Sequence, residues 1–204
     1  MTKSGAIEDE GDTRIWLDIV REAGDWAMLE PVEALATAAA VAVAQLSHSP
    51  AADLVAGSTA SPRTRGNRSR RISRPHRQLD VCLVLADDDT VRALNRDYRG
   101  KDKPTNVLSF PAPAAPRRAA GYDGPCFLGD IVIAAETLAR EAADDGIAPA
   151  HHFQHLVIHG LLHLLGHDHE TDVEAVVMEA LEVRALASLG VPSPYLGREP
   201  VMDA

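Results

Sequence analysis

The feature that most constrains this chain is a histidine-rich and otherwise apolar stretch in its C-terminal half. It reads His159-Gly-Leu-Leu-His163-Leu-Leu-Gly166-His-Asp-His169. Histidines four residues apart on a helix lie on one face, one turn apart. Gly166 can adopt the left-handed conformation that ends helices, so the chain can reverse there and bring His169 over the pair. Three neutral imidazoles with a fourth position open are typical of a catalytic zinc site. We therefore predict one zinc ion held by His159, His163 and His169.

Other polar residues of this region compete for a role at the metal. Seven of the nine histidines lie in this helix and the segment after it, which argues against a chance arrangement. His155 is the one serious rival ligand, because a row at four-residue steps drifts by about 40° per step and carries His151 off the face. His152 and His167 are expected to face solvent. Asp168 either orients a ligand imidazole from beside the site or caps the next helix.

The spacing HxxxHxxGxxH is that of the metzincin proteases, with Gly160 in place of the glutamate base of HExxH. A dipositive ion with neutral ligands can activate water by itself, because it lowers the pKa of the bound water to about 7. Peptide hydrolysis must also protonate an amine leaving group, so the missing glutamate impairs a protease more than an enzyme that cuts phosphodiesters. A metalloprotease and a non-catalytic zinc-binding module remain as alternatives. Imidazole ligands also suit nickel, copper and iron.

Charge and cysteine usage restrict the class of protein. The net charge of −10 argues against broad non-specific nucleic-acid binding, and no DNA partner is expected. Residues 61–77 nevertheless hold seven arginines and no acid, a tract that either contacts phosphates or serves as an inert linker. Cys82 and Cys126 support neither a disulfide framework nor a thiolate zinc site. The first fifteen residues lack an apolar run and 34–46 is too short to cross a bilayer, so we expect a cytoplasmic protein without a membrane partner.

The hydrophobic pattern alternates between strands and helices. Strands are predicted over 15–20, 79–85, 107–110 and 127–134, and helices over 32–46, 90–97, 135–145, 150–165 and 171–189. This order predicts an α+β fold, an α/β sandwich in which a mixed sheet of about four strands packs against helices, with the histidine-bearing helix central. The chain suits a single domain, 1–204, with an ordered core of about 15–189. A flexible insertion rich in Arg, Ser and Pro is expected at 47–75, together with an irregular loop at 112–124 and a loose C-terminal tail.

Two signatures resemble a known family. They are Tyr98-Arg-Gly-Lys-Asp-Lys-Pro-Thr-Asn-Val-Leu-Ser-Phe-Pro111, followed by Leu128-Gly-Asp-Ile131, and the stretch from His159 to His169. Both are similar to the YbeY-type metal-dependent endoribonucleases of bacteria, and the element order fits over most of the chain. The resemblance implies a zinc enzyme that cuts single-stranded RNA, with His159, His163 and His169 as ligands. It further implies a role in ribosomal RNA processing on the small subunit, notably at the 3′ end of 16S RNA, and in ribosome quality control.

The segment after Tyr98 supplies candidate contacts for RNA. The resemblance implies that Arg99 matters for activity, and a guanidinium can take two oxygens of a phosphate in a bidentate fork. We expect Arg99 to contact the reacting phosphate beside a metal-bound water, although spacing alone leaves an ordinary surface arginine equally open. Lys101 and Lys103 are expected to line the RNA path as point charges. Asp130, in a strand interior, is expected to brace the site as a buried polar residue.

Overall fold

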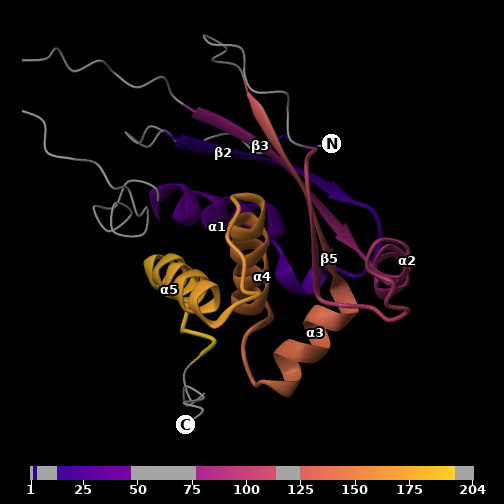
Figure 1. Cartoon of the computed structure of the whole chain (residues 1–204). Helices are drawn as coiled ribbons and strands as arrows, with labels where there is room; N and C mark the ends of the chain where they lie inside the picture. The colour runs from indigo at the N-terminus through magenta and orange to yellow at the C-terminus, as the bar shows by residue number, and fades with distance from the viewer. Residues whose placement is uncertain (1, 4–12, 47–76, 114–124, 196–204) are drawn as a thin grey trace, which may run out of the picture.

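A single mixed sheet organises the protein. The computed structural model describes residues 2–3, 13–46, 77–113 and 125–195, and within them five strands pair in the order β1-β2-β3-β5-β4. Strands β2 (Thr13–Arg21), β3 (Arg77–Ala86) and β5 (Cys126–Ala134) run parallel, and β4 (Val107–Pro111) pairs antiparallel with β5 (Figure 1). Strand β1 (Thr2–Lys3) adds two residues antiparallel to β2. The predicted mixed sheet of about four strands is confirmed, and β1 is an addition to it.

The five α-helices in the described part of the chain agree with the hydrophobic pattern to within a few residues. They are α1 (Val32–Leu46), α2 (Asp88–Arg99), α3 (Ala135–Asp144), α4 (Pro149–Leu164) and α5 (Asp172–Ser188), and a short 3-10 turn, η1 (Ala27–Leu29), precedes α1. Side-chain hydrogen bonds cap the N-termini of two of these helices. Asp87 accepts the backbone N–H of Thr90 at the start of α2, and Thr171 forms a capping box with Glu174 at the start of α5. The α+β class predicted from the element order is confirmed.

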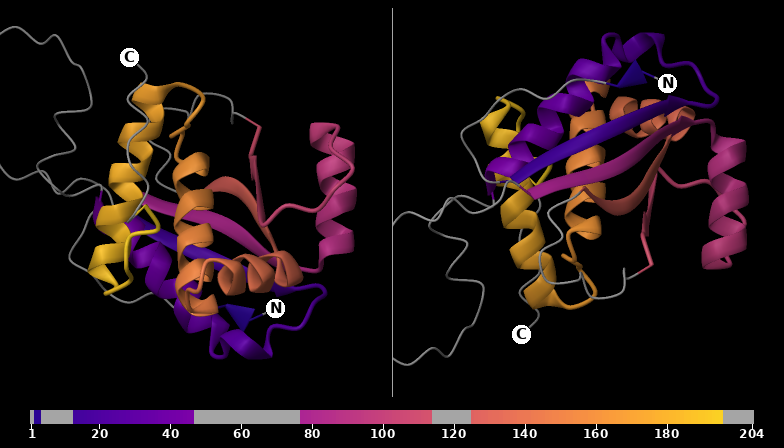
Figure 2. Two further views of the ribbon diagram at one scale, coloured as in Figure 1. Left: turned by 90° about the horizontal axis from the view of Figure 1, so that it is seen from below. Right: turned by 90° about the horizontal axis from the view of Figure 1, so that it is seen from above.

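Helix α4 is the centre of the molecule. It packs against strands β4 and β5 of the sheet and is flanked by α1, α3 and α5, all on one side of the sheet (Figure 2). Strand alternation turns one set of apolar side chains toward these helices, including Leu17, Ile19, Leu83, Leu85 and Ile131. Helix α4 contributes Phe153, Val157, Ile158, Leu161 and Leu162 to the same core. The position of the histidine-bearing helix is thus fixed by packing on nearly all of its sides.

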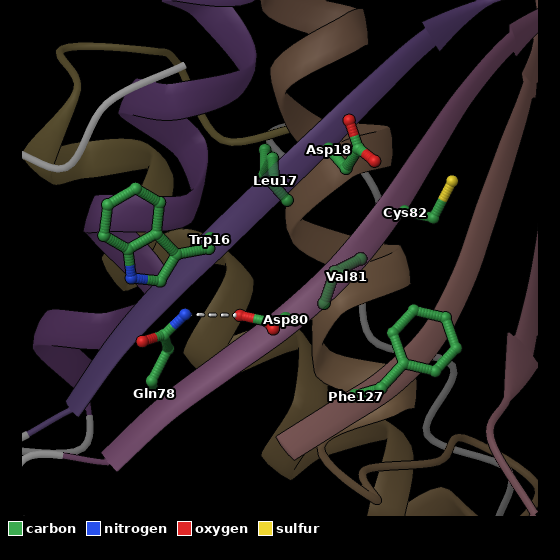
Figure 3. Close-up of a pocket in the computed structure, with 8 residues that line it drawn as sticks. All are labelled: Trp16, Leu17, Asp18, Gln78, Asp80, Val81, Cys82 and Phe127. Atoms are coloured by element: carbon green, nitrogen blue, oxygen red, sulfur yellow. Dashed lines mark hydrogen bonds between the residues drawn. The ribbon is translucent and has the colours of Figure 1, made fainter. Parts of the chain in front are cut away.

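Helix α2 lies on the opposite face of the sheet and covers one part of it. Its Val91 packs in a second, smaller core against Ala86, Leu108, Val132 and Ala134. The remaining part of this face is an open hollow of about 570 Å³ (Figure 3). Aromatic and acidic side chains line it, among them Trp16, Asp18, Asp80 and Phe127, and Gln78 Nε2 donates to Asp80 Oδ1 at 3.0 Å.

The two cysteines are free and lie in different strands, Cys82 in β3 and Cys126 in β5. Cys82 projects from β3 into the open hollow, away from α4 (Figure 3). Burial, together with the negative charges of Asp130 and Asp18, raises the pKa of the Cys82 thiol to about 11. The thiol therefore stays protonated at neutral pH and is a poor metal ligand, since metals bind the thiolate.

Several predicted segments fall outside the described residues. They are the insertion at 47–75, most of the irregular loop at 112–124 and the tail beyond Tyr195. Among the helices of the described ranges, none combines the length and the apolar character needed to span a bilayer.

Candidate metal centre

One stripe of α4 remains partly exposed, and it is the stripe that carries histidines. Between His151 and Leu164 every residue of the helix is buried except His151, His155, His159 and His163. Because these four follow one another at steps of four residues, they form a row along the helix. The apolar packing of the other faces therefore fixes the direction in which the row points. A helix held in this way is a rigid support for a metal site.

The end of α4 returns the chain over this row. Gly166 has a φ of +93°, and its N–H donates to the carbonyl of His163 at 3.0 Å. The next N–H, that of His167, donates to the carbonyl of Leu162 at 3.0 Å. These two bonds form a Schellman motif, which needs a left-handed residue at the position that Gly166 occupies. The reversal leads the chain to His169, whose ring centroid lies 5.5 Å from that of His159 and 5.0 Å from that of His163.

His159, His163 and His169 form what we call the three-histidine cluster. One nitrogen from each ring lies within 4.8 Å of the others. Nε2 of His159 and Nε2 of His163 face each other at 3.1 Å. Two nitrogens bound to one tetrahedral zinc ion at the usual length would lie about 3.3–3.4 Å apart, so the pair already has nearly the spacing that the ion requires. Burial, and then the nearby His159 and His169, lower the pKa of His163, which keeps its imidazole neutral and able to bind a metal.

A buried carboxylate lies behind the cluster. Glu182 of α5 is 1% exposed, and its Oε1 accepts from Nδ1 of His159 at 2.7 Å. Its Oε2 lies 3.3 Å from Nε2 of His155 and accepts the hydroxyl of Tyr195. Burial alone raises the pKa of Glu182, but the hydrogen bonds from His155, His159 and Tyr195 lower it below its ordinary value. The carboxylate is thus ionised among three donors.

Glu182 is not among the site residues predicted above, although the sequence holds a signal for it. The buried residues of α5 are Met178, Glu182, Ala185 and Leu186, which follow the spacing of one apolar helix face. A glutamate at such a position is almost never buried unless it is paired. A partner in the core was therefore to be expected, but the identity of that partner depends on how α5 packs on α4.

Three of the remaining histidines differ in their surroundings. His152 was predicted to face solvent, and this is wrong: it is buried and its Nε2 lies 2.9 Å from Glu141 Oε2. The physical reason is the central position of α4, which buries the face that would be polar in a peripheral helix. His167 is half-buried at the edge of the cluster, and burial lowers its pKa. His155 contacts Glu182 on the far side of His159 from His163, so it does not join the three-histidine cluster.

A groove of about 730 Å³ runs beside the cluster, and we call it the cationic groove. Its walls are the end of α2, the loop after it, strand β4 and the end of α4 with the segment that follows. Three basic side chains, Arg99, Lys101 and Lys103, line it together with His159, His163 and His169. Two acids, Asp168 and Glu170, also lie on its rim. The structure therefore brings the predicted phosphate-binding residues and the predicted metal ligands to one concave surface.

Local contacts fix the basic wall of this groove. Nη2 of Arg99, at the end of α2, donates to the carbonyl of Ser109 in β4 at 3.3 Å. Helix α2 ends at Gly100, which has a φ of +69°. The buried Asn95 then holds the following loop, because its side-chain amide donates to the carbonyl of Lys103 at 2.7 Å. Arg99 and both lysines are themselves exposed and so remain available to a ligand.

The two predicted supporting acids lie at different places. Asp168 Oδ1 accepts the backbone N–H of His169 at 2.8 Å and lies 3.9 Å from Nδ1 of His163, so it adjoins two members of the cluster. It does not cap α5, because Thr171 does. Asp130 lies on the face of β5 away from α4, next to Cys82 and the side of α2. The direct support of the metal site that we predicted for Asp130 is not made among the described residues.

Gly160, the residue at the place of the protease glutamate, faces the sheet. A Cβ at this position would lie 2.9 Å from Cγ2 and 3.0 Å from Cδ1 of Ile131 in β5. Carbon atoms in ordinary contact are about 3.5–4.0 Å apart, so a side chain here would overlap with the core. Position 160 therefore could not present a carboxylate to the metal even if the residue were changed.

The three-histidine cluster lies in a segment that is similar to known proteins. A family model described as "Endoribonuclease YbeY" matches residues 67–190. A curated protein of Rhodopseudomonas palustris named Endoribonuclease YbeY is 54% identical over 127 residues, which are 61% of this chain and 65% of that protein. One of the same name from Rhodospirillum rubrum is 55% identical over 121 residues, 59% of this chain and 60% of that protein. The matched segment thus covers less than two thirds of the length of each of these two relatives. A solution structure from Thermotoga maritima shows 20% identity and a TM-score of 0.42 over 94% of this chain and 99% of that one.

Proposed function

The chain belongs to the YbeY endoribonuclease family, and on that premise we propose that it is a zinc-dependent endoribonuclease that cuts single-stranded RNA. One observation carries the proposal: the three-histidine cluster and three basic side chains share the cationic groove. In an RNA strand the phosphate that reacts would face the metal, and the neighbouring phosphates of the backbone would face the basic side chains. Neither an isolated metal site nor an isolated basic patch would combine binding with cleavage in this way.

In this proposal His159, His163 and His169 hold the ion through neutral imidazoles. When bound, zinc supplies a Lewis acid for a phosphoryl oxygen and makes water a nucleophile at neutral pH. The three ligands carry no charge, so the full dipositive charge of the ion remains available to the phosphate. His159 and His163 are half-buried on the packed helix α4, which keeps their nitrogens in place before RNA binds, and the turn at Gly166 brings the exposed His169 to them.

Arg99 is proposed to bind the non-bridging oxygens of the phosphate that reacts. Its guanidinium can donate to two oxygens at once, and the negative charge on these oxygens is highest in the transition state. The hydrogen bond to the carbonyl of Ser109 occupies one N–H and orients the group, while the rest of the side chain stays exposed in the groove. Lys101 and Lys103 are proposed to bind neighbouring phosphates. Asp168 is proposed to hold the turn that positions His169.

The preference for single strands follows from the shape of the substrate. An A-form duplex holds its phosphates in fixed geometry, whereas a single strand can bend one linkage toward the metal. Within the family premise, we propose ribosomal RNA as the substrate, with the 3′ end of 16S RNA on the small subunit as the site of maturation and a role in ribosome quality control. This assignment places the protein in the cytoplasm.

The two alternatives receive less support from the structure. A metalloprotease of this spacing would need a base near the metal, and the space beside Gly160 is filled by Ile131. A purely structural zinc site would be closed by a fourth ligand, whereas the three-histidine cluster opens onto the cationic groove.

The test measures how fast the zinc-loaded protein cleaves each of three substrates. We expect cleavage of a single-stranded RNA oligonucleotide, weak cleavage of the same sequence in a perfect duplex, and no hydrolysis of casein. A chelator should abolish RNA cleavage and zinc should restore it, while His163→Ala should stay inactive after zinc addition. Casein hydrolysis by a protein that leaves RNA intact would refute the proposal. A precursor small-subunit RNA, with its 3′ end mapped after digestion, tests the proposed site.

A further inference from the structure

We propose that Glu182 is a positioning residue of the metal centre, which holds His159 in the tautomer and orientation that present its Nε2 to the zinc ion. Tyr195 and His155 in turn hold Glu182. The inference rests on the proposed zinc site but not on the proposed RNA substrate.

The contact with His159 determines which ring nitrogen is free. A carboxylate oxygen accepts hydrogen bonds, and Oε2 of Glu182 already accepts the hydroxyl of Tyr195, so across the 2.7 Å to Oε1 it is Nδ1 of His159 that donates. In a neutral imidazole the lone pair then lies on Nε2, the atom that faces Nε2 of His163. A carboxylate behind a ligand imidazole also raises the basicity of the coordinating nitrogen. Glu182 thereby selects the nitrogen that binds and strengthens its bond to the metal.

The surroundings of Glu182 explain how a charge is tolerated there. A carboxylate that is 1% exposed is destabilised unless donors replace the water it has lost. Here the donors come from two separate segments: His155 and His159 lie on α4, and Tyr195 lies in the segment after α5. The ring of Tyr195 also stands edge-on to that of His155, at a centroid distance of 6.2 Å. These contacts connect the chain after α5 to the metal site.

The distances distinguish a positioning residue from a ligand. His155, His159 and Glu182 also bring ligand atoms within 4.8 Å of one another, so a second metal ion between them must be considered. A tetrahedral zinc ion would hold its nitrogen and oxygen ligands about 3.3 Å apart, whereas Nδ1 of His159 and Oε1 of Glu182 are 2.7 Å apart. That spacing fits a charge-assisted hydrogen bond and leaves too little room for an ion between the two atoms. To bind a second metal through Nδ1, His159 would also have to give up the one N–H proton of its neutral ring.

The test measures zinc affinity and stoichiometry in full-length protein without RNA. Glu182→Gln keeps the shape of the side chain and an oxygen that can accept from His159, but it removes the charge. We expect one zinc per chain in both proteins, with affinity about 10- to 100-fold lower in the variant, in the range found when a partner of a ligand histidine is changed. Glu179→Gln is the matched control, because Glu179 is exposed on the same helix. It should bind zinc as the unaltered protein does.

Two further measurements separate positioning from loss of structure. In the zinc-loaded protein, nitrogen-15-edited NMR should detect a proton on Nδ1 of His159, strongly downfield because it is shared with a carboxylate, and it should move upfield in Glu182→Gln. Melting of the metal-free proteins identifies variants that fail to fold. If Glu182→Gln fails in this way, Tyr195→Phe replaces it, because the ring stays and Glu182 loses only the hydroxyl donor. Zinc affinity should then fall below that of Glu179→Gln, and equal affinity in the two variants would overturn the inference.

Several results would overturn the inference. Unchanged zinc affinity in a folded Glu182→Gln protein would show that the carboxylate does not support His159. Two zinc ions per chain, falling to one in the variant, would show that Glu182 is a ligand. An equal loss of affinity in Glu179→Gln would indicate a general effect of charge on α5. None of these measurements uses RNA, so the proposed nuclease activity is judged independently of them.

Discussion

Replacement of Arg99 by alanine should separate chemistry from folding and from metal binding. Arg99 is exposed, and the hydrogen bond that it donates within the protein, to the carbonyl of Ser109, is 3.3 Å long. Substitutions of exposed residues usually change stability by no more than about 0.5 kcal/mol. Arg99 is not one of the proposed metal ligands, so the zinc content of Arg99→Ala should stay at one per chain. Loss of one preorganised charge stabiliser, by contrast, lowers a rate by about 100- to 1000-fold, which corresponds to about 2.7–4 kcal/mol.

The assay is single-turnover cleavage of a labelled single-stranded RNA, with zinc content and melting temperature measured on the same preparations. Arg96→Ala is the control, because Arg96 lies in the last turn of the same helix, pairs with Asp97 and does not line the cationic groove. Arg99→Lys should fall between Arg99→Ala and the unaltered protein, since it keeps the charge but loses the two-pronged donor. Equal rates in Arg99→Ala and Arg96→Ala would refute the role of Arg99, and loss of zinc in Arg99→Ala would show that the residue is structural.

Two further predictions concern α4. His163→Ala should lose zinc at concentrations that saturate the unaltered protein, whereas His155→Ala should retain one equivalent by metal analysis; an equal loss in both would mean that the ligands are misassigned. Gly160→Ala should lower the free energy of unfolding in denaturant titrations, because overpacking against Ile131 costs about 1–3 kcal/mol and the gain in helix propensity is about 1 kcal/mol. Gly160→Glu should give little folded protein and no casein hydrolysis, and a well-folded Gly160→Glu variant would contradict the close packing of α4 on β5.

The geometry of the three-histidine cluster was accessible from the sequence because it is local. Spacing along one helix, together with a left-handed glycine at its end, determines where His159, His163 and His169 can lie. The helices and long strands could be predicted for the same reason, because the hydrophobic period and the capping residues of each element lie within the element itself. The features that could be predicted are therefore those that depend on the residues of one short segment alone.

The residues that were misplaced or missed depend on packing between segments. His152 looks polar and peripheral in the sequence, but α4 is enclosed on that side and pairs His152 with Glu141. Asp130 precedes four consecutive buried residues of β5, so the sequence shows no alternation that would indicate which face of the sheet Asp130 lies on. The register between β3 and β5 also shifts between Asp80 and Val81, and this irregularity cannot be predicted from either strand alone. Glu182 lies 23 residues beyond its partner His159. Such contacts require the tertiary arrangement and cannot be read from any one stretch.

Gly160 connects the packing of α4 with the chemistry proposed for the groove. Because this position has no side chain, α4 can approach β5 until the site for a Cβ lies within 3 Å of Ile131. The same approach brings the hydroxyl of Ser109 to 3.5 Å from the carbonyl of Gly160, while the Ser109 carbonyl accepts from Arg99. The glycine that removes a protease base from the motif thus allows the metal-binding helix and the strand that orients the guanidinium to come together. The cationic groove thus holds, beside the three-histidine cluster, a guanidinium whose two-pronged donor suits the phosphate contact proposed for Arg99.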